Sequence, residues 1–171
     1  MNRLNKYRKN GAIGALLDEY EKSISALILV IEDIKECDLI KIVDTKTKDE
    51  DCKSIQSILS HTILSGYNYV IEIRKWLGEE IMYKSKPTYT TTNQYIDGLK
   101  TMFQYNEKLF SDHPNIKIET HETDKKLVVR WGQTYDVEQL LEHAIVHILR
   151  HRRQIEKFKL ILDITPFDEL L

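Results

Sequence analysis

The chain has 171 residues, which is enough for one domain with a sizeable core. Hydrophobic residues make up 42% and charged residues 30% of it, and this balance excludes a disordered chain. The formal net charge is −2 and basic residues are mixed with acidic ones, so the basic surface typical of nucleic-acid-binding proteins is missing. We therefore expect a single domain over residues 1–171 with no nucleic-acid partner.

The cysteines and the apolar segments indicate the compartment. Cys37 and Cys52 lack CxxC spacing, which favours free thiols in a reducing environment. Residues 1–9 are polar and basic, without the apolar run of a secretory signal. The apolar run 24–34 is interrupted by polar residues and falls short of the roughly 20 apolar residues that a membrane span needs. The sequence predicts a soluble, cytoplasmic protein with no membrane partner.

Apolar residues at three- and four-residue intervals predict a first helix over about 12–36. The charged, Thr-rich stretch that follows reads as a loop, and we expect a second helix to begin close to Asp49 and to end at Gly78. Gly66, in the middle of this second helix, suits the close approach of another helix. Residues 81–92 read as a connection long enough to cross the end of a bundle.

The second half of the chain predicts two more helices with a small β element between them. The third helix covers about 93–110 and the fourth about 136–162, with Asp136 as its N-cap. Near-alternating segments at 116–120 and 127–131 suggest the two strands of a small hairpin. Four long amphipathic helices predict an all-α protein with the architecture of a four-helix bundle.

Three histidines, His143, His147 and His151, follow one another at intervals of four residues in the predicted fourth helix. Imidazoles at i and i+4 lie on one helix face and can converge on one metal ion, which suits His147 and His151. Three residues in such a row extend over about 12 Å of helix, so one of them must lie outside the first coordination shell. The alternative is a structural role, in which buried imidazoles only form hydrogen bonds.

A metal site would need a further ligand from another helix, and His61 in the predicted second helix is the best candidate. Ser65, Asn68 and Glu72 follow it at helical spacing and form a polar line that could border a pocket or lie on an exposed flank. His113 and His121 lie in predicted loops, and we interpret both as solvated. We interpret the basic residues of 150–153 as a solvated helix face.

The motif H-x-x-x-H-R-x-Q-I at 147–155, accompanied by the single histidine His61 in the second helix, resembles the DinB/YfiT-like family of four-helix-bundle metalloenzymes over nearly the whole chain. The resemblance implies a site for zinc or nickel with His61, His147 and His151 as ligands and His143 outside the first shell. It makes Gln154 and Asn68 candidates for orienting ligands or substrate, with Ser65 in the pocket. Arg153 stands where many members have glycine, and its side chain could narrow the site or point outward.

The family includes transferases that join low-molecular-weight thiols to electrophilic small molecules, and the resemblance therefore implies this activity and a small-molecule substrate. Two alternatives stay open: metal-assisted hydrolysis, and a non-catalytic metal-binding protein connected with stress or with protein interactions. A homodimer, formed through apolar flanks of the bundle, is a further expectation from the resemblance.

Overall fold

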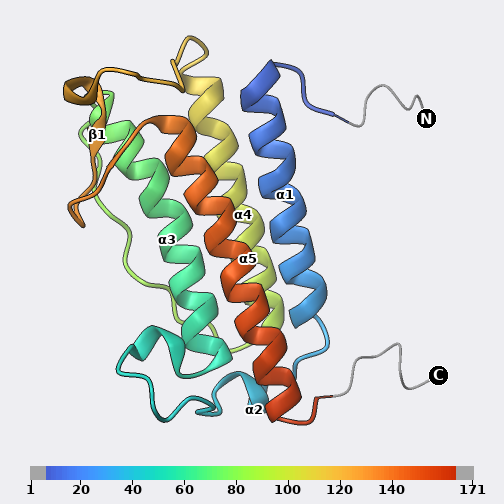
Figure 1. Cartoon of the computed structure of the whole chain (residues 1–171). Helices are drawn as coiled ribbons and strands as arrows, with labels where there is room; N and C mark the ends of the chain where they lie inside the picture. The colour runs from blue at the N-terminus through green and yellow to red at the C-terminus, as the bar shows by residue number, and fades with distance from the viewer. Residues whose placement is uncertain (1–6, 165–171) are drawn as a thin grey trace.

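The computed structural model describes residues 7–164, and its main body is a bundle of four long helices (Figure 1). The long helices are α1 (Gly11–Ile31), α3 (Ile55–Trp76), α4 (Thr92–Asp112) and α5 (Val137–Ile161). A short helix, α2 (Glu36–Leu39), and a 3₁₀ turn, η2 (Glu50–Cys52), lie between α1 and α3, and a second 3₁₀ turn, η3 (Thr123–Lys125), follows α4. The predicted all-α, four-helix architecture is confirmed.

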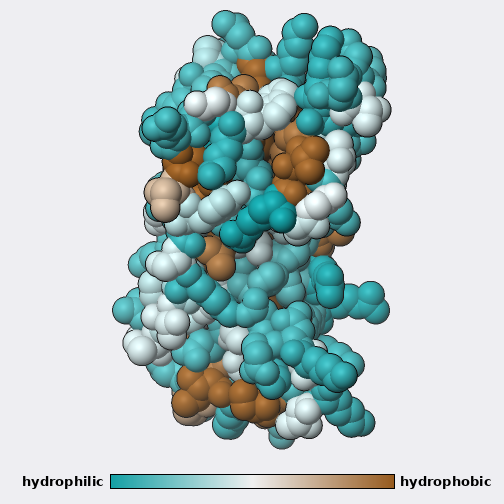
Figure 2. All heavy atoms as spheres, turned by 90° about the vertical axis from the view of Figure 1, so that its left-hand side faces the viewer, coloured by the Kyte–Doolittle hydropathy of each residue, from teal (hydrophilic) through white to brown (hydrophobic). Residues whose placement is uncertain are grey.

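The long helices are arranged in a square, in which α5 packs against α1 and α3, and α4 packs against the same two helices from the other side (Figure 1). Buried apolar residues from all four helices form one continuous core. Among the described residues, no helix is both long and apolar enough to span a membrane. The face that carries α3 and the hairpin is mostly hydrophilic, with separate hydrophobic patches (Figure 2).

We predicted a connection between α3 and α4 that is long enough to cross the end of the bundle. In the structure the connection runs back along the length of the bundle instead (Figure 1). At one end, Gln56 near the start of α3 donates a hydrogen bond to the carbonyl of Tyr89, shortly before α4 begins (2.9 Å). At the other end, Arg74 pairs with Asp112, so the last turns of both helices lie together (2.6 Å). The two helices are therefore parallel, and the connection is held beside α3.

The first helix ends at Ile31, about five residues before the predicted end. In a longer helix the carbonyl of Val30 would accept from the amide of Ile34, but here it accepts from the Lys159 ammonium (2.9 Å). The same ammonium pairs with Asp33, and the Ile34 amide turns to Ile31 instead (3.0 Å). A contact with α5 thus decides where α1 ends.

The second predicted helix also begins later than expected, because Asp49 caps η2 and not α3. The cap of α3 is Ser54, which forms a capping box with Ser57 in which each side chain accepts from the other residue's backbone N–H. The predicted C-terminal signal is confirmed: Gly78, with φ of +91°, lies two residues beyond the end of α3. The predicted Asp136 cap of α5 is confirmed as well.

A two-stranded antiparallel hairpin lies between α4 and α5, as predicted, but it does not use the predicted pair of segments. Strand β1 (Leu127–Val128) pairs with β2 (Thr134–Tyr135) across a turn at Gly132, which has φ of +86°. Residues 116–120 form no strand, because the carbonyl of Ile118 accepts from Glu138 at the start of α5 (3.0 Å). This bond satisfies one of the N–H groups that a helix start leaves unpaired.

Candidate metal centre

Three histidines converge where α3 and α5 pack against each other. His61 lies in the second turn of α3, and His147 and His151 lie one turn apart on α5. The Nε2 atom of His147 is 3.0 Å from Nε2 of His61 and 3.1 Å from Nε2 of His151. The three potential ligand atoms all lie within 4.8 Å of one another. The structure thus contains a candidate three-histidine metal site.

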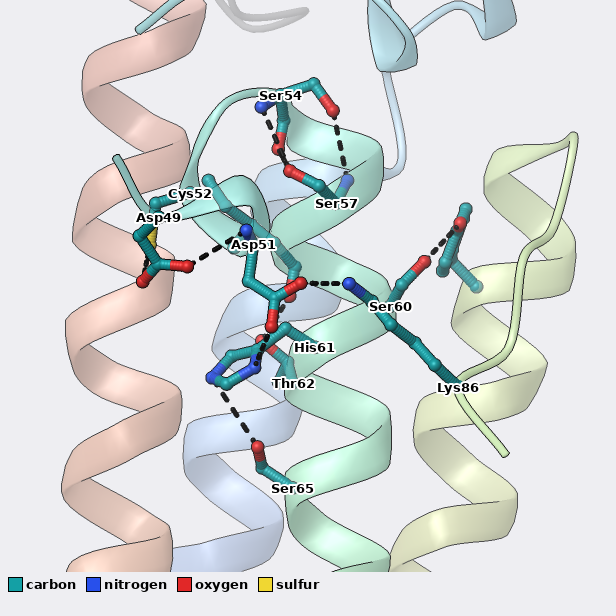
Figure 3. Close-up of polar contacts among 12 residues, drawn as sticks. Asp49, Asp51, Cys52, Ser54, Ser57, Ser60, His61, Thr62, Ser65 and Lys86 are labelled. Atoms are coloured by element: carbon teal, nitrogen blue, oxygen red, sulfur yellow. Dashed lines mark hydrogen bonds and ion pairs between the residues drawn. The ribbon is translucent and has the colours of Figure 1, made fainter. Parts of the chain in front are cut away.

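The outer ring nitrogens of two of these histidines have hydrogen-bond acceptors. Nδ1 of His61 faces the Asp51 carboxylate at 3.1 Å (Figure 3), and Nδ1 of His151 faces the side-chain oxygen of Gln154 at 3.1 Å. Both acceptors place the ring hydrogen on Nδ1, so the Nε2 lone pairs point toward the convergence point. This is the arrangement that second-shell groups impose on metal-binding imidazoles.

Burial keeps the imidazoles on α5 uncharged. Burial, together with repulsion from the neighbouring imidazoles, lowers the pKa of His147 to about 2. Burial and the nearby His61 lower the pKa of His151 to about 4. Both rings are therefore neutral at pH 7, and the neutral form is the one that binds metal ions.

The donor set fits a divalent transition metal. With Zn–N bonds of about 2.0–2.1 Å, two ligand nitrogens in a tetrahedral site are about 3.3 Å apart, close to the two Nε2 separations here. Nε2 of His147 carries at most one hydrogen, so it can donate to only one of the two Nε2 atoms that lie 3.0 and 3.1 Å from it. The Ser65 hydroxyl lies 3.5 Å from Nε2 of His61. A cation between the three nitrogens would be bound by all three lone pairs, and imidazole ligands suit zinc, copper, iron and nickel.

One short turn supports both helices of the site. Asp51 of η2 accepts from His61 with Oδ2 and pairs through Oδ1 with Lys86, which comes from the α3–α4 connection (Figure 3). On the other side of the turn, the carbonyl of Cys52 accepts from Gln154 (3.5 Å). The turn therefore supplies the carboxylate that contacts His61 and the carbonyl that holds Gln154, the residue hydrogen-bonded to His151.

A cavity of about 390 Å³ opens beside the three histidines. Its lining includes two of them, His61 and His147, while His151 lies on the buried side of the cluster. The other lining residues come from α3, the hairpin region and α5: Ser65, Asn68, Tyr69, Arg130, Trp131, Gln133 and His143. A small molecule in this cavity could contact an ion bound by the histidines.

His143 belongs to the cavity wall and not to the histidine cluster. Its Nδ1 lies 3.3 Å from the hydroxyl of Tyr135, and that hydroxyl donates to the side-chain oxygen of Gln133. The indole N–H of Trp131 donates to the same oxygen (3.0 Å). Because the Tyr135 hydrogen is used, His143 donates from Nδ1 and keeps a lone pair on Nε2.

The polar line predicted along α3 divides into two parts. Ser65 and Asn68 line the cavity, and Oδ1 of Asn68 is buried without a hydrogen-bond partner among the described residues. Glu72 lies outside the cavity lining, where it accepts from the hydroxyl of Tyr83 (2.7 Å).

The remaining sequence-predicted positions lie away from the site. His121 is exposed, as predicted, but His113 is half-buried and contacts the Glu79 carboxylate (2.6 Å), so the solvated-loop interpretation of His113 is wrong. Arg153 is exposed and does not line the cavity, so it points outward. The two cysteines are both free: Cys37 is exposed and Cys52 is buried.

No protein-family model and no curated protein sequence matches the chain. The class that the fold and the site define is a mostly helical protein with a candidate three-histidine metal centre.

Proposed function

We propose that this protein binds a divalent ion, zinc or nickel, and catalyses the transfer of a low-molecular-weight thiol to an electrophilic small molecule. The observation that carries the proposal is the convergence of three Nε2 atoms at the wall of a cavity. Three protein ligands leave a coordination position for a small molecule, which is typical of catalytic metal sites, whereas structural zinc sites have four protein ligands.

The residues of the cavity have separate roles in the proposed reaction. A divalent ion in such a site lowers the pKa of a thiol that it binds. The thiol loses its proton, its sulfur forms a bond to the electrophilic carbon, and the leaving group departs with the electrons of the bond that breaks. His143 would accept the thiol proton on Nε2, because its Nδ1 donates to Tyr135.

The cavity wall offers no carboxylate base for metal-assisted hydrolysis. Metal-dependent hydrolases commonly use a carboxylate as the base that activates water. The lining contains no aspartate or glutamate. Asp51 contacts His61 from outside the cavity lining, and its two carboxylate oxygens are occupied by His61 and Lys86.

Metal binding is tested by removing two of the proposed ligands. The purified protein is stripped with a chelator, reloaded with zinc or nickel and analysed for metal content. We expect about one ion per chain in the wild type and in a His121→Ala control, and almost none in the His61→Ala/His147→Ala double variant. Circular dichroism checks that the double variant is folded. Equal metal contents in all three proteins would refute the proposed site.

Thiol transfer is tested separately, by following the consumption of thiol in the presence of a set of electrophiles. We expect consumption above background only for the metal-loaded protein, and we expect His143→Gln to lower the rate without lowering the metal content. If the metal-loaded wild type consumes no thiol with any electrophile, the transferase proposal is wrong and only metal binding remains.

A further inference from the structure

Apart from its imidazoles, the cavity beside the histidines is lined by one ionisable side chain with an ordinary charge, the cationic Arg130. Arg130 follows strand β1 and lines the cavity together with Trp131 and Gln133 of the same hairpin. No acidic residue is among the lining residues. A divalent ion at His61 and His147 would add two further positive charges at the other part of the wall.

The guanidinium of Arg130 is held by an aromatic ring instead of a carboxylate. It lies over the ring of Tyr83, 4.5 Å from the ring centre, and the ammonium of Lys75 also lies near that ring, at 4.6 Å. The hydroxyl of Tyr83 donates to the buried Glu72, which fixes the ring. Among residues 7–164, neither Arg130 nor Lys75 forms an ion pair with an acidic side chain.

The surrounding aromatic and polar groups are suited to a small organic molecule. Tyr69 and Trp131 stand edge to face at 5.9 Å between ring centres and provide an apolar wall. Asn68 lines the cavity, and its Oδ1 atom is buried and has no partner among the described residues. An arginine fork binds carboxylates through charge-assisted hydrogen bonds, often with two N–H groups at once.

We infer that the cavity selects an anionic small molecule, whose carboxylate pairs with Arg130 while its other end reaches the face formed by His61 and His147. This inference names the substrate class of the proposed transferase. That the molecule carries a thiol at the end near the histidines rests on the proposed function. That it carries a carboxylate at the other end rests on the charge of the cavity wall alone. The hairpin therefore carries the residue that sets specificity.

The test compares ligands that differ only in charge. The protein is loaded with Co²⁺, and its absorption spectrum is followed during titration with mercaptocarboxylates of increasing chain length and with the mercaptoalcohols of the same length. Since a hydrogen bond to a charged group contributes about 1.5–3 kcal/mol, we expect the best acid to bind about tenfold or more tightly than its alcohol. Arg130→Gln should remove this preference and leave the affinity for the alcohols unchanged.

Lys75→Gln is the matched control, because Lys75 contacts the same Tyr83 ring but does not line the cavity. We expect it to retain most of the preference for the acids. Arg130→Lys should restore part of the preference that Arg130→Gln removes. Loss of the preference in Lys75→Gln, or its persistence in Arg130→Gln, would overturn the assignment to Arg130.

A second pair of probes separates this inference from the proposed function. Benzoate and benzyl alcohol contain no thiol, and their binding is followed through the NMR shifts of the amides of residues 130–133. We expect benzoate to shift these amides in the wild type but not in Arg130→Gln, and benzyl alcohol to have little effect in either. If this result is obtained and no thiol binds Co²⁺, anion selection stands and thiol transfer fails. If neither pair of probes shows a preference for the anion, the inference is wrong.

Discussion

Substitution of Gly66 by alanine tests how closely α3 and α4 approach each other. A Cβ atom at Gly66 would overlap the Met102 side chain, with Cγ at 2.8 Å and Cε at 2.9 Å. Met102 is fully buried, and its sulfur contacts the Asn106 amide at 3.3 Å and the Tyr20 hydroxyl at 3.7 Å. The methionine cannot move without disturbing these neighbours, so the helices must separate or the side chain must repack.

Two opposing effects determine the size of the change. Alanine is favoured over glycine in a helix interior by about 1 kcal/mol. Overpacking of a buried site costs about 1–3 kcal/mol. We therefore expect Gly66→Ala to lower the free energy of unfolding by about 1 kcal/mol. In a Met102→Ala background the overlap is absent, and the same substitution should instead stabilise the protein by about 1 kcal/mol.

The assay is urea unfolding of the four proteins of this double-mutant cycle, followed by far-UV circular dichroism. Met102→Ala alone should cost about 2–5 kcal/mol, because it leaves a cavity. The expected coupling between the two substitutions is about 2 kcal/mol. If Gly66→Ala changes the free energy of unfolding by the same amount with Met102 and with Ala at position 102, the reasoning is refuted. The Met102 side chain would then not obstruct a Cβ atom at position 66.

Three further predictions concern the second shell, acid stability and capping. Asp51→Asn weakens the acceptor of the His61 Nδ1–H, and should reduce zinc affinity about tenfold in a chelator competition, because loss of such partners typically costs 10- to 100-fold; an unchanged affinity would contradict the role of Asp51. The hydrogen bond from His113 lowers the pKa of Glu79 in the folded protein. The ionised carboxylate therefore stabilises the fold above its unfolded-state pKa of 4.5, and this stabilisation is lost as the pH falls through the lower folded-state pKa. Between pH 6 and pH 3, Glu79→Gln should lose less free energy of unfolding in urea than the wild type, and equal losses would argue against the contact between Glu79 and His113. Asp136→Ala removes the cap of α5 and should cost about 1 kcal/mol in the same assay, with Asp124→Ala, in the exposed turn η3, as the neutral control.

The four helices could be predicted from the sequence because each carries a long, regular stripe of apolar residues. Their ends were less predictable wherever a distant residue decides them. The end of α1 depends on Lys159, which lies on α5, and no local pattern near Val30 indicates this contact. The direction of α4 was missed for the same reason, since the Arg74–Asp112 pair that aligns it with α3 joins distant parts of the chain.

The three histidines of the candidate site could be predicted from the sequence, but most of the residues that surround and orient them could not. Spacing on one helix placed His147 and His151 together, His61 was the best candidate among the remaining histidines, and the resemblance implied the same three ligands. The residues missed include Asp51, Lys86 and Arg130, which come from irregular segments or turns where no periodicity fixes the position of a side chain. Tyr69 was also missed, although it lies on α3 and lines the cavity. A carboxylate ten positions before a histidine is not a local motif, so only the folded turn η2 reveals the contact.

The separation of the proposed ligands along the chain has a kinetic consequence. His61 and His147 lie 86 positions apart, on two helices that pack against each other. An ion between them would act as a reversible cross-link, and α5 could not leave the bundle before a coordination bond had broken. Interactions of this kind slow unfolding more than they accelerate folding if they form after the folding transition state. The unfolding rate, measured with and without a chelator, would then report the occupancy of the site without any substrate.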